Sequence, residues 1–174
     1  MSSRIRSLTL AVTLALVGST LASAAEAIRI RAGTTTKHTD ETGVVWLAEQ
    51  GFVGGDIVER GEIAIANTKT PSLYRTERYG MDSFTQAVAN GKYTVKLHFA
   101  ETYDGIAGVG NRVFTFNVEG KEFKDFDITA KAGGDFRAYV VTVDVEIKDG
   151  KLNVTFTNQV ENCVINAIEI IPAG

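Results

Sequence analysis

The chain has 174 residues, and its 18 lysines and arginines are nearly balanced by 21 aspartates and glutamates, for a formal net charge of −3. This balance provides no basic surface, which argues against nucleic acid and against an anionic membrane surface as partners. The single cysteine, Cys163, cannot form an intrachain disulfide, and its place in an apolar run predicts a small buried residue rather than a reactive thiol.

Residues 1–24 are predicted to be a secretory signal peptide. Two arginines near the N-terminus precede an apolar stretch at 8–17, and small residues precede the cleavage site expected after Ala24, with a second possible site after Ala27. The apolar stretch is well short of the roughly 20 residues that span a bilayer, so no permanent anchor is expected. Cleavage leaves residues 25–174, which we expect to form a single exported domain.

In the first third of the mature chain, a strand is expected at 28–31, where apolar and charged residues alternate. A second strand is expected within 57–66, where isoleucines alternate with other residues. Glycines interrupt the pattern elsewhere, so loops are expected at 33–43 and around Phe52. Trp46 lies in a short apolar cluster and is expected in the core.

The clearest strand pattern, at 93–99, leads into a loop that could carry a binding site. Because a strand places alternate side chains on one face, four residues should point into the core: Tyr93, Val95, Leu97 and Phe99. The opposite face contains His98, which is expected to be partly exposed. The loop that follows is acidic and aromatic, and loops anchored on rigid strands often bind ligands. Its candidate residues are Glu101, Tyr103 and Asp104.

Three two-residue turn signals predict β-hairpins at Asn90-Gly91, Glu119-Gly120 and Asp149-Gly150. Each turn is flanked by apolar residues at alternate positions. The expected strands are 84–88 with 93–99, 114–118 with the segment from Phe123, and 139–147 with 152–156. A final apolar run at 163–171, rich in β-branched residues, should close the domain.

The strand patterns, the closely spaced turns and the absence of a convincing helical period predict an all-β fold. Only two prolines interrupt the mature chain, and no internal repeat or low-complexity linker divides it. Half-buried strands of this kind are typical of an antiparallel two-sheet β-sandwich.

Enzymatic motifs are weak in this sequence. Neither a Gly-x-Ser-x-Gly elbow nor a phosphate-binding glycine loop is present. Glu101 and Asp104 could form the acid and base of a glycoside hydrolase, although acidic loop residues are ordinarily solvated. We therefore expect a protein that is not an enzyme, with a glycosidase as a distant alternative.

Metal and cofactor sites are not expected either. His38 and His98 do not have the spacing of joint zinc ligands. Asp125 and Asp127 could contact calcium, but the other oxygen ligands of a calcium loop are not visible, and the two carboxylates are expected to be solvated on either side of a buried Phe126.

The stretch Leu73–Gly80 combines aromatic rings with charged groups. A sugar needs this combination, because its C–H faces lie on aromatic rings while its hydroxyl groups require donors and acceptors. Tyr74 is expected to pack in the core, and Glu77 and Arg78 are expected to pair internally with opposite charges. Tyr79, like Tyr103 of the later loop, could face either the core or a ligand.

Motifs spread over the mature chain resemble those of the malectin domain family. The matching segments are Leu73–Tyr79, Gly91–Tyr103, Arg112–Phe114, Val118–Gly120, Asp125–Ile128 and Asn166–Ile170. The resemblance implies a jelly-roll sandwich similar to galactose-binding domains, with a carbohydrate-binding and non-catalytic role. An animal member of this family recognises a glucose disaccharide at the end of N-linked glycans.

The same resemblance implies four binding residues. Tyr79 and Tyr103 match ring platforms of the family, whereas its acidic ligand before the final strand falls on Glu161, which departs from the family pattern. Asp104 stands where the animal protein has an aromatic residue, and with Glu161 it is expected to accept hydrogen bonds from sugar hydroxyl groups. A further aromatic of the family has no clear counterpart, although Phe52 lies nearby.

The expected function is therefore the binding of glucose-containing di- or oligosaccharides by an exported, lectin-like domain in the periplasm or outside the cell. The alternative is an envelope or extracellular sandwich that has lost sugar binding and serves protein interaction or structure. Oligosaccharide or polysaccharide is the expected partner, and another envelope or extracellular protein is the second candidate. We expect no nucleic acid, cofactor or metal, and no membrane anchor in the mature chain.

Overall fold

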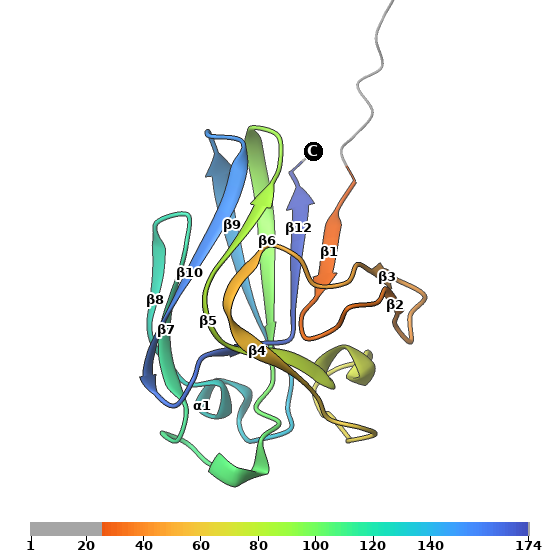
Figure 1. Ribbon diagram of the computed structural model, residues 1–174, viewed down its shortest axis with the longest axis vertical. Coiled ribbons are helices and arrows are strands. Elements are labelled where there is room, and N and C mark those ends of the chain that lie inside the picture. Colours follow the sequence, from red (N-terminus) through yellow and green to blue (C-terminus); the bar gives the residue numbers. More distant parts are fainter. Residues whose placement is uncertain (1–25, 174) are drawn as a thin grey trace, which may run out of the picture.

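The computed structural model describes residues 26–173, in which most strands belong to two antiparallel sheets packed face to face (Figure 1). This arrangement confirms the predicted β-sandwich. The four-stranded sheet has the order β1 (Ile28–Arg31), β12 (Ala167–Pro172), β6 (Gly91–Phe99) and β9 (Tyr139–Ile147). The predicted signal peptide of residues 1–24 lies outside the described residues.

The second sheet has six strands, and β5 (Thr76–Ala87) is the longest of them. Its order is β11 (Val164–Ile165), β5, β10 (Lys151–Val160), β7 (Val113–Val118) and β8 (Lys121–Phe126), with β4 (Phe52–Glu59) also paired to β5. A small separate pair consists of β2 (His38–Thr39) and β3 (Val45–Trp46). The helical segments are short: η1 (Pro71–Tyr74), η2 (Asp104–Ile106) and α1 (Ile128–Ala132). No helix within residues 26–173 has the length and apolar character needed to cross a membrane.

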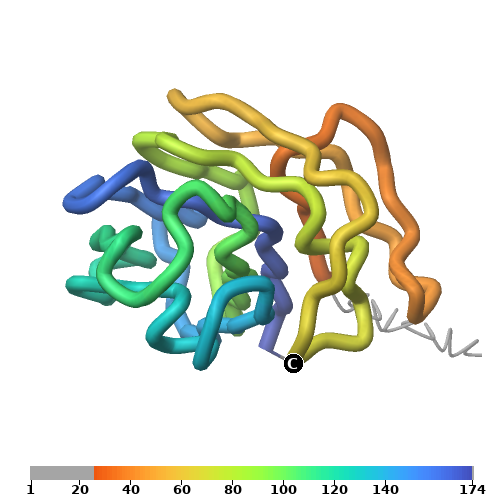
Figure 2. The backbone as a smooth tube through the Cα atoms, turned by 90° about the horizontal axis from the view of Figure 1, so that it is seen from below, coloured from red at the N-terminus to blue at the C-terminus, as the bar shows by residue number. Residues whose placement is uncertain are grey.

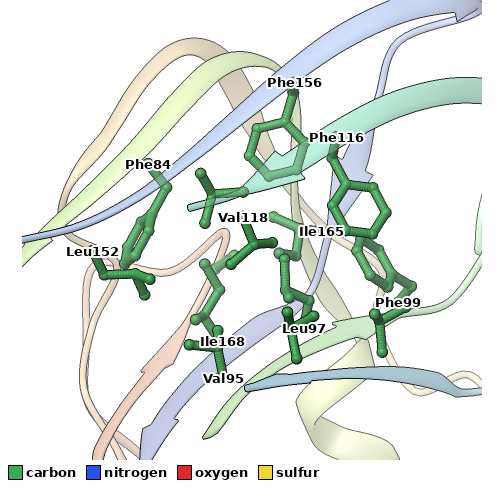
Figure 3. Packing of buried hydrophobic residues seen from close by; sticks show 14 of the residues in the cluster. Phe84, Val95, Leu97, Phe99, Phe116, Val118, Leu152, Phe156, Ile165 and Ile168 are labelled. Carbon is green, nitrogen blue, oxygen red and sulfur yellow. The ribbon is translucent and has the colours of Figure 1, made fainter. Parts of the chain in front are cut away.

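The main core lies between the two sheets, where alternate residues of the facing strands meet (Figure 3). Val95, Leu97 and Phe99 of β6 are fully buried, and Tyr93 is nearly so, as their alternation predicts. From the opposite sheet, Phe84, Phe116, Val118 and Leu152 point toward them. Each fully buried side chain of this kind contributes roughly 1.5–3 kcal/mol, so the core is the main source of stability.

The prediction that His98 is partly exposed is wrong, because a second apolar cluster covers the outer face of the four-stranded sheet. His98 is 7% exposed. Its Nδ1 lies 2.9 Å from the Tyr74 hydroxyl and its Nε2 lies 3.0 Å from a Glu169 oxygen. Trp46 packs edge-on against its ring. Trp46 and Tyr74 are core residues, as predicted.

Only one of the three predicted hairpins is correct. Glu119-Gly120, with both residues at positive φ, joins the paired strands β7 and β8. Asn90-Gly91 instead connects β5 to β6, and Asp149-Gly150 connects β9 to β10, so both turns pass from one sheet to the other. These two turns are hydrogen-bonded to each other, since the Asn90 side chain donates to Lys148 O and accepts from Gly150 N. Turn residues reverse the chain, but they do not specify which sheet the next strand joins.

The expected loop around Phe52 is strand β4, and the strand expected within 57–66 ends at Glu59. Gly55 in β4 adopts φ +71°, and a Cβ atom there would overlap the backbone of Tyr79 in β5. The glycines that suggested a loop therefore allow the close approach of two strands.

The prediction of two solvated carboxylates at Asp125 and Asp127 is wrong for Asp127. This residue is buried and caps α1, because its Oδ1 accepts from Ala130 N at 2.9 Å and its Oδ2 accepts from Gly110 N at 2.6 Å. Asp125 is exposed and Phe126 is buried, as predicted.

Candidate functional site

A pocket of about 390 Å³ is formed where β4, β5, the loop after β6 and the turn between β10 and β11 meet. The loop, residues 103–112, lies at the lower end of the molecule in Figure 1, the end from which Figure 2 is viewed. The lining residues are Ile57, Val58, Arg60, Glu77, Tyr79, Tyr103, Arg112, Glu161 and Asn162.

Three of the four residues predicted to bind a ligand line this pocket. Tyr79, Tyr103 and Glu161 come from three segments that are far apart in sequence, and the fold brings them together. Asp104 follows Tyr103 directly and is exposed, but it does not line the pocket. Phe52 also lies elsewhere, with its ring centroid 4.9 Å from that of Phe84 at the core.

Tyr79 is held by its position within the six-stranded sheet. Its strand pairs on one side with Asp56 of β4 and on the other with Val164 of β11. The side chain is half-buried and packs against the main core. Tyr79 therefore presents a fixed ring to the pocket.

Tyr103 lies on the loop after β6 and is 42% exposed. Its backbone N–H donates to Glu101 Oε1 at 2.9 Å. The guanidinium carbon of Arg60 is 5.3 Å from the centroid of its ring. A Cβ atom at Gly105 would lie 2.5 Å from Tyr103 Cζ, so the ring rests on this glycine.

Two buried carboxylates hold both the loop and the pocket arginines. Glu77, 2% exposed, accepts from Arg60 Nη2 at 2.6 Å with one oxygen and from the Thr102 hydroxyl at 2.6 Å with the other. The predicted internal pairing of Glu77 is thus confirmed. Arg78, the other residue predicted to pair internally, donates to Glu49 Oε1 at 2.5 Å.

The second buried carboxylate is Glu101, which is also 2% exposed. Its Oε2 accepts from Arg112 Nε at 2.5 Å, while its Oε1 receives the N–H of Tyr103. Arg112 also donates through Nη1 to the carbonyl of Asn162. Among residues 26–173, no group accepts a hydrogen bond from Arg112 Nη2, and this atom is not fully buried. It can therefore donate to a ligand in the pocket that Arg112 lines.

Glu161 lies at the rim, in the turn after β10, with φ at +58°. Its carboxylate is exposed and accepts from Asn162 N at 3.3 Å. The turn is fixed because Cys163 N donates to the side chain of Asn158 at 2.7 Å. Glu161 is therefore an acceptor at the rim that pairs with neither pocket arginine.

The Glu101 and Asp104 carboxylates are not arranged as an acid and base of one site. Both oxygens of buried Glu101 are occupied, and neither residue lines the pocket. Within the described part of the chain, no group of three or more His, Cys, Asp or Glu side chains could hold a metal ion.

Sequence patterns missed the two arginines of the pocket. Arg112 lies in one of the segments that resemble the malectin family, but its motif gave no indication of a role. Arg60 follows β4 in a stretch expected to be strand, and only its contacts with Glu77 and Tyr103 identify it.

Comparisons with known proteins agree with the sandwich and with the motifs. The malectin domain model matches residues 26–171. Malectin-B and Malectin-A of Xenopus laevis are each 33% identical to the chain over 135 residues, which cover 70% of this chain and 48% of each relative. The chain thus spans about half the length of these curated relatives.

Solved structures resemble the chain in fold. A Bacteroides uniformis beta-glucuronidase matches with a TM-score of 0.75 and 18% identity over 85% of this chain and 18% of the enzyme. The ANXUR2 extracellular domain from Arabidopsis thaliana matches with a TM-score of 0.72 and 16% identity over 83% of this chain and 48% of that domain. At these identities the likeness shows the fold alone.

Proposed function

The chain belongs to the malectin domain family, and from this membership we propose that it binds carbohydrate without catalysing its turnover. The observation that carries the proposal is the meeting of Tyr79, Tyr103 and Glu161 in one pocket. Aromatic rings suit the C–H faces of a sugar, and carboxylates accept hydrogen bonds from its hydroxyl groups.

Four pocket residues and the neighbouring Asp104 have roles in the proposed complex. The rings of Tyr79 and Tyr103 contact the apolar faces of the sugar, and Glu161 accepts from its hydroxyl groups. Arg112 supplies the complementary donor, because its Nη2 is uncommitted while Glu101 and Asn162 fix the rest of the guanidinium. Asp104, outside the pocket and exposed, contacts the part of an oligosaccharide that extends beyond it.

The proposed ligand is a glucose-containing di- or oligosaccharide. The pocket volume of about 390 Å³ lies at the small end of the roughly 300–1,000 Å³ of small-molecule sites. The ligand therefore has one or two rings enclosed, with the remainder over the rim. The likeness to a glucuronidase concerns the fold and adds no catalytic group to this pocket.

We further propose that residues 25–174 act as a single exported domain in the periplasm or outside the cell. The predicted signal at 1–24 supports this placement. Fractionation of cells that express the full-length chain, with N-terminal sequencing of the product, tests both export and cleavage after Ala24 or Ala27.

Isothermal titration calorimetry with glucose disaccharides, followed by a broad glycan array, tests the function. We expect saturable binding of at least one glucose-containing sugar, and loss of that binding in Tyr79→Ala and Glu161→Ala. Val140→Ala is the control, since Val140 is 38% exposed and lies in β9 away from the pocket. Failure of every sugar on the array to bind would reject carbohydrate binding.

The second candidate function is protein binding. The observation that favours it is the edge strand β4, which among the described residues pairs only with β5. Val53 and Ile57 on this strand are 57% and 45% exposed. Open strand edges can pair with an extended segment of another protein. A wild-type protein that binds no sugar, but loses a partner when Val53→Lys is introduced, would support this second function.

A further inference from the structure

We propose that Arg60 is a positioning residue that fixes the ring of Tyr103 for the ligand, with buried Glu77 as its anchor. This inference rests on the proposed sugar-binding function, because it assigns how one of the two binding rings is held. The order of the Tyr103 ring in the unliganded protein can be measured without any sugar.

Tyr103 requires such a device because of where it lies. Its side chain is 42% exposed and projects from a loop, so few packing contacts restrain it. The ring lies against Gly105 at its Cζ atom, and the guanidinium carbon of Arg60 lies 5.3 Å from its centroid. A guanidinium within about 6 Å of an aromatic centroid is attracted to the ring.

Arg60 can restrain the ring because Arg60 is itself fixed at both ends. Its backbone N–H donates to Arg75 O at 2.7 Å. Its Nη2 donates to Glu77 Oε1 at 2.6 Å, and Glu77 is 2% exposed. Among residues 26–173, Arg60 is the one basic residue that forms an ion pair with Glu77. The buried carboxylate holds this partner firmly, because an unpaired buried charge is costly.

The contacts also form a closed circuit of four residues, in which Glu77, Thr102, Tyr103 and Arg60 each contact or adjoin the next. Glu77 binds Arg60 with one oxygen and the Thr102 hydroxyl with the other, each at 2.6 Å. Thr102 precedes Tyr103 in the chain, and the guanidinium of Arg60 lies over the Tyr103 ring. Glu77 thus fixes the ring of Tyr103 from the backbone side through Thr102 and from the ring side through Arg60.

A ring ordered before the ligand arrives improves affinity, because binding then need not immobilise it. Loss of the Arg60 contact should therefore weaken sugar binding by about three- to tenfold. Arg60→Gln removes the cation. Arg60→Lys keeps a cation for Glu77, so it should recover stability and part of the ring order.

The matched control is Arg75→Gln. Arg75 pairs with Glu62 at 2.6 Å, its side chain is 20% exposed against 24% for Arg60, and it does not line the pocket. Arg75→Gln should leave sugar affinity within about twofold of the wild type, because Arg75 and its exposed partner Glu62 lie outside the pocket.

The deciding measurement is the order of the Tyr103 ring in the unliganded protein, from relaxation of ¹³C-labelled tyrosine, with the signal assigned by its loss in Tyr103→Leu. We expect the ring to be ordered in the wild type and in Arg75→Gln, mobile in Arg60→Gln, and intermediate in Arg60→Lys. Equal ring order in the wild type and in Arg60→Gln would overturn the proposal. So would unchanged sugar affinity in Arg60→Gln. If the wild type binds no sugar, the proposed function fails while the ring measurement still decides the role of Arg60.

Discussion

The ring of Tyr103 rests on Gly105, where an added Cβ atom would lie 2.5 Å from Tyr103 Cζ and 2.6 Å from its hydroxyl oxygen. Because the side chain is exposed, it can rotate away without disturbing the core. Gly105→Ala should therefore displace the ring and lower sugar affinity, with little change in the free energy of unfolding. Gly120, in the turn between β7 and β8, does not line the pocket. The control variant Gly120→Ala should therefore keep the sugar affinity of the wild type. Full affinity in Gly105→Ala would contradict the contact.

Tyr103→Ala should abolish sugar binding and change the free energy of unfolding by no more than about 0.5 kcal/mol, as is usual for surface positions. The matched tyrosine is Tyr93, which is 7% exposed and whose hydroxyl donates to Ala89 O. Tyr93→Ala should cost about 3–5 kcal/mol, because it empties part of the core. Urea unfolding monitored by circular dichroism measures both values. Equal losses for the two variants would mean that Tyr103 is a structural residue.

The buried pair Glu101–Arg112 should be costly to break from one side. Their side chains are 3% and 6% exposed, with Oε2 and Nε 2.5 Å apart. Arg112→Met leaves a buried unpaired carboxylate and should lower the free energy of unfolding by about 3–5 kcal/mol. The exposed pair Lys148–Glu146 is the comparison, and Lys148→Met should cost less than about 1 kcal/mol.

Adding Glu101→Gln to Arg112→Met should recover part of the lost stability, because the remaining buried group is then neutral. A double variant that is as unstable as the sum of the two single variants would show that the residues do not interact. Sugar affinity should stay low in the double variant, since the Arg112 donor is absent.

Acid should destabilise the protein through Glu169. Burial raises the pKa of this carboxyl, but hydrogen bonds and charge from His98, with Lys96 and Arg29, outweigh burial and lower the pKa below its ordinary value of 4.5. A lowered folded-state pKa means that the stabilisation is fully present above about pH 4.5, the unfolded value, and is lost as the pH falls through the folded value.

Melting temperatures between pH 3 and about 7 test this linkage in the wild type and in Glu169→Gln. The variant should be less stable at neutral pH and should lose less stability on acidification. Glu146→Gln, a change in a side chain that is 56% exposed, should follow the wild type. If the melting temperature falls equally on acidification in the wild type and in Glu169→Gln, Glu169 is not the cause of the acid destabilisation.

Cys163 should resist thiol reagents in the folded protein. It is fully buried, its Sγ lies 3.3 Å from Met81 O, and burial raises the pKa of the thiol to about 11. Reaction with a disulfide reagent at pH 8 should therefore be negligible until denaturant is added, when one thiol per chain reacts. Rapid labelling without denaturant would contradict the buried position.

The local patterns of the sequence predicted several strands, among them 93–99, and the side chains that these strands direct into the core. The side chains from Tyr93 to Phe99 alternate between the core and the opposite face, because a strand has a period of two residues. This period can be recognised within a single short segment of sequence. The turn at Glu119-Gly120 could also be predicted from local sequence, because it depends on the positive φ angles of these two residues. Family motifs identified Tyr79, Tyr103 and Glu161 as candidates, which the fold then placed in one pocket.

Contacts between distant segments decided the rest. The sequence alone could not reveal that Asn90-Gly91 crosses between sheets, that Trp46 and Tyr74 pack against His98, or that Arg60 lies over Tyr103. Strand partners, burial of an outer face and contacts across a pocket depend on the packing of elements far apart in the chain. The tyrosines and the carboxylate of the candidate site could therefore be predicted, whereas its arginines and the contacts around Tyr103 were seen only in the tertiary structure.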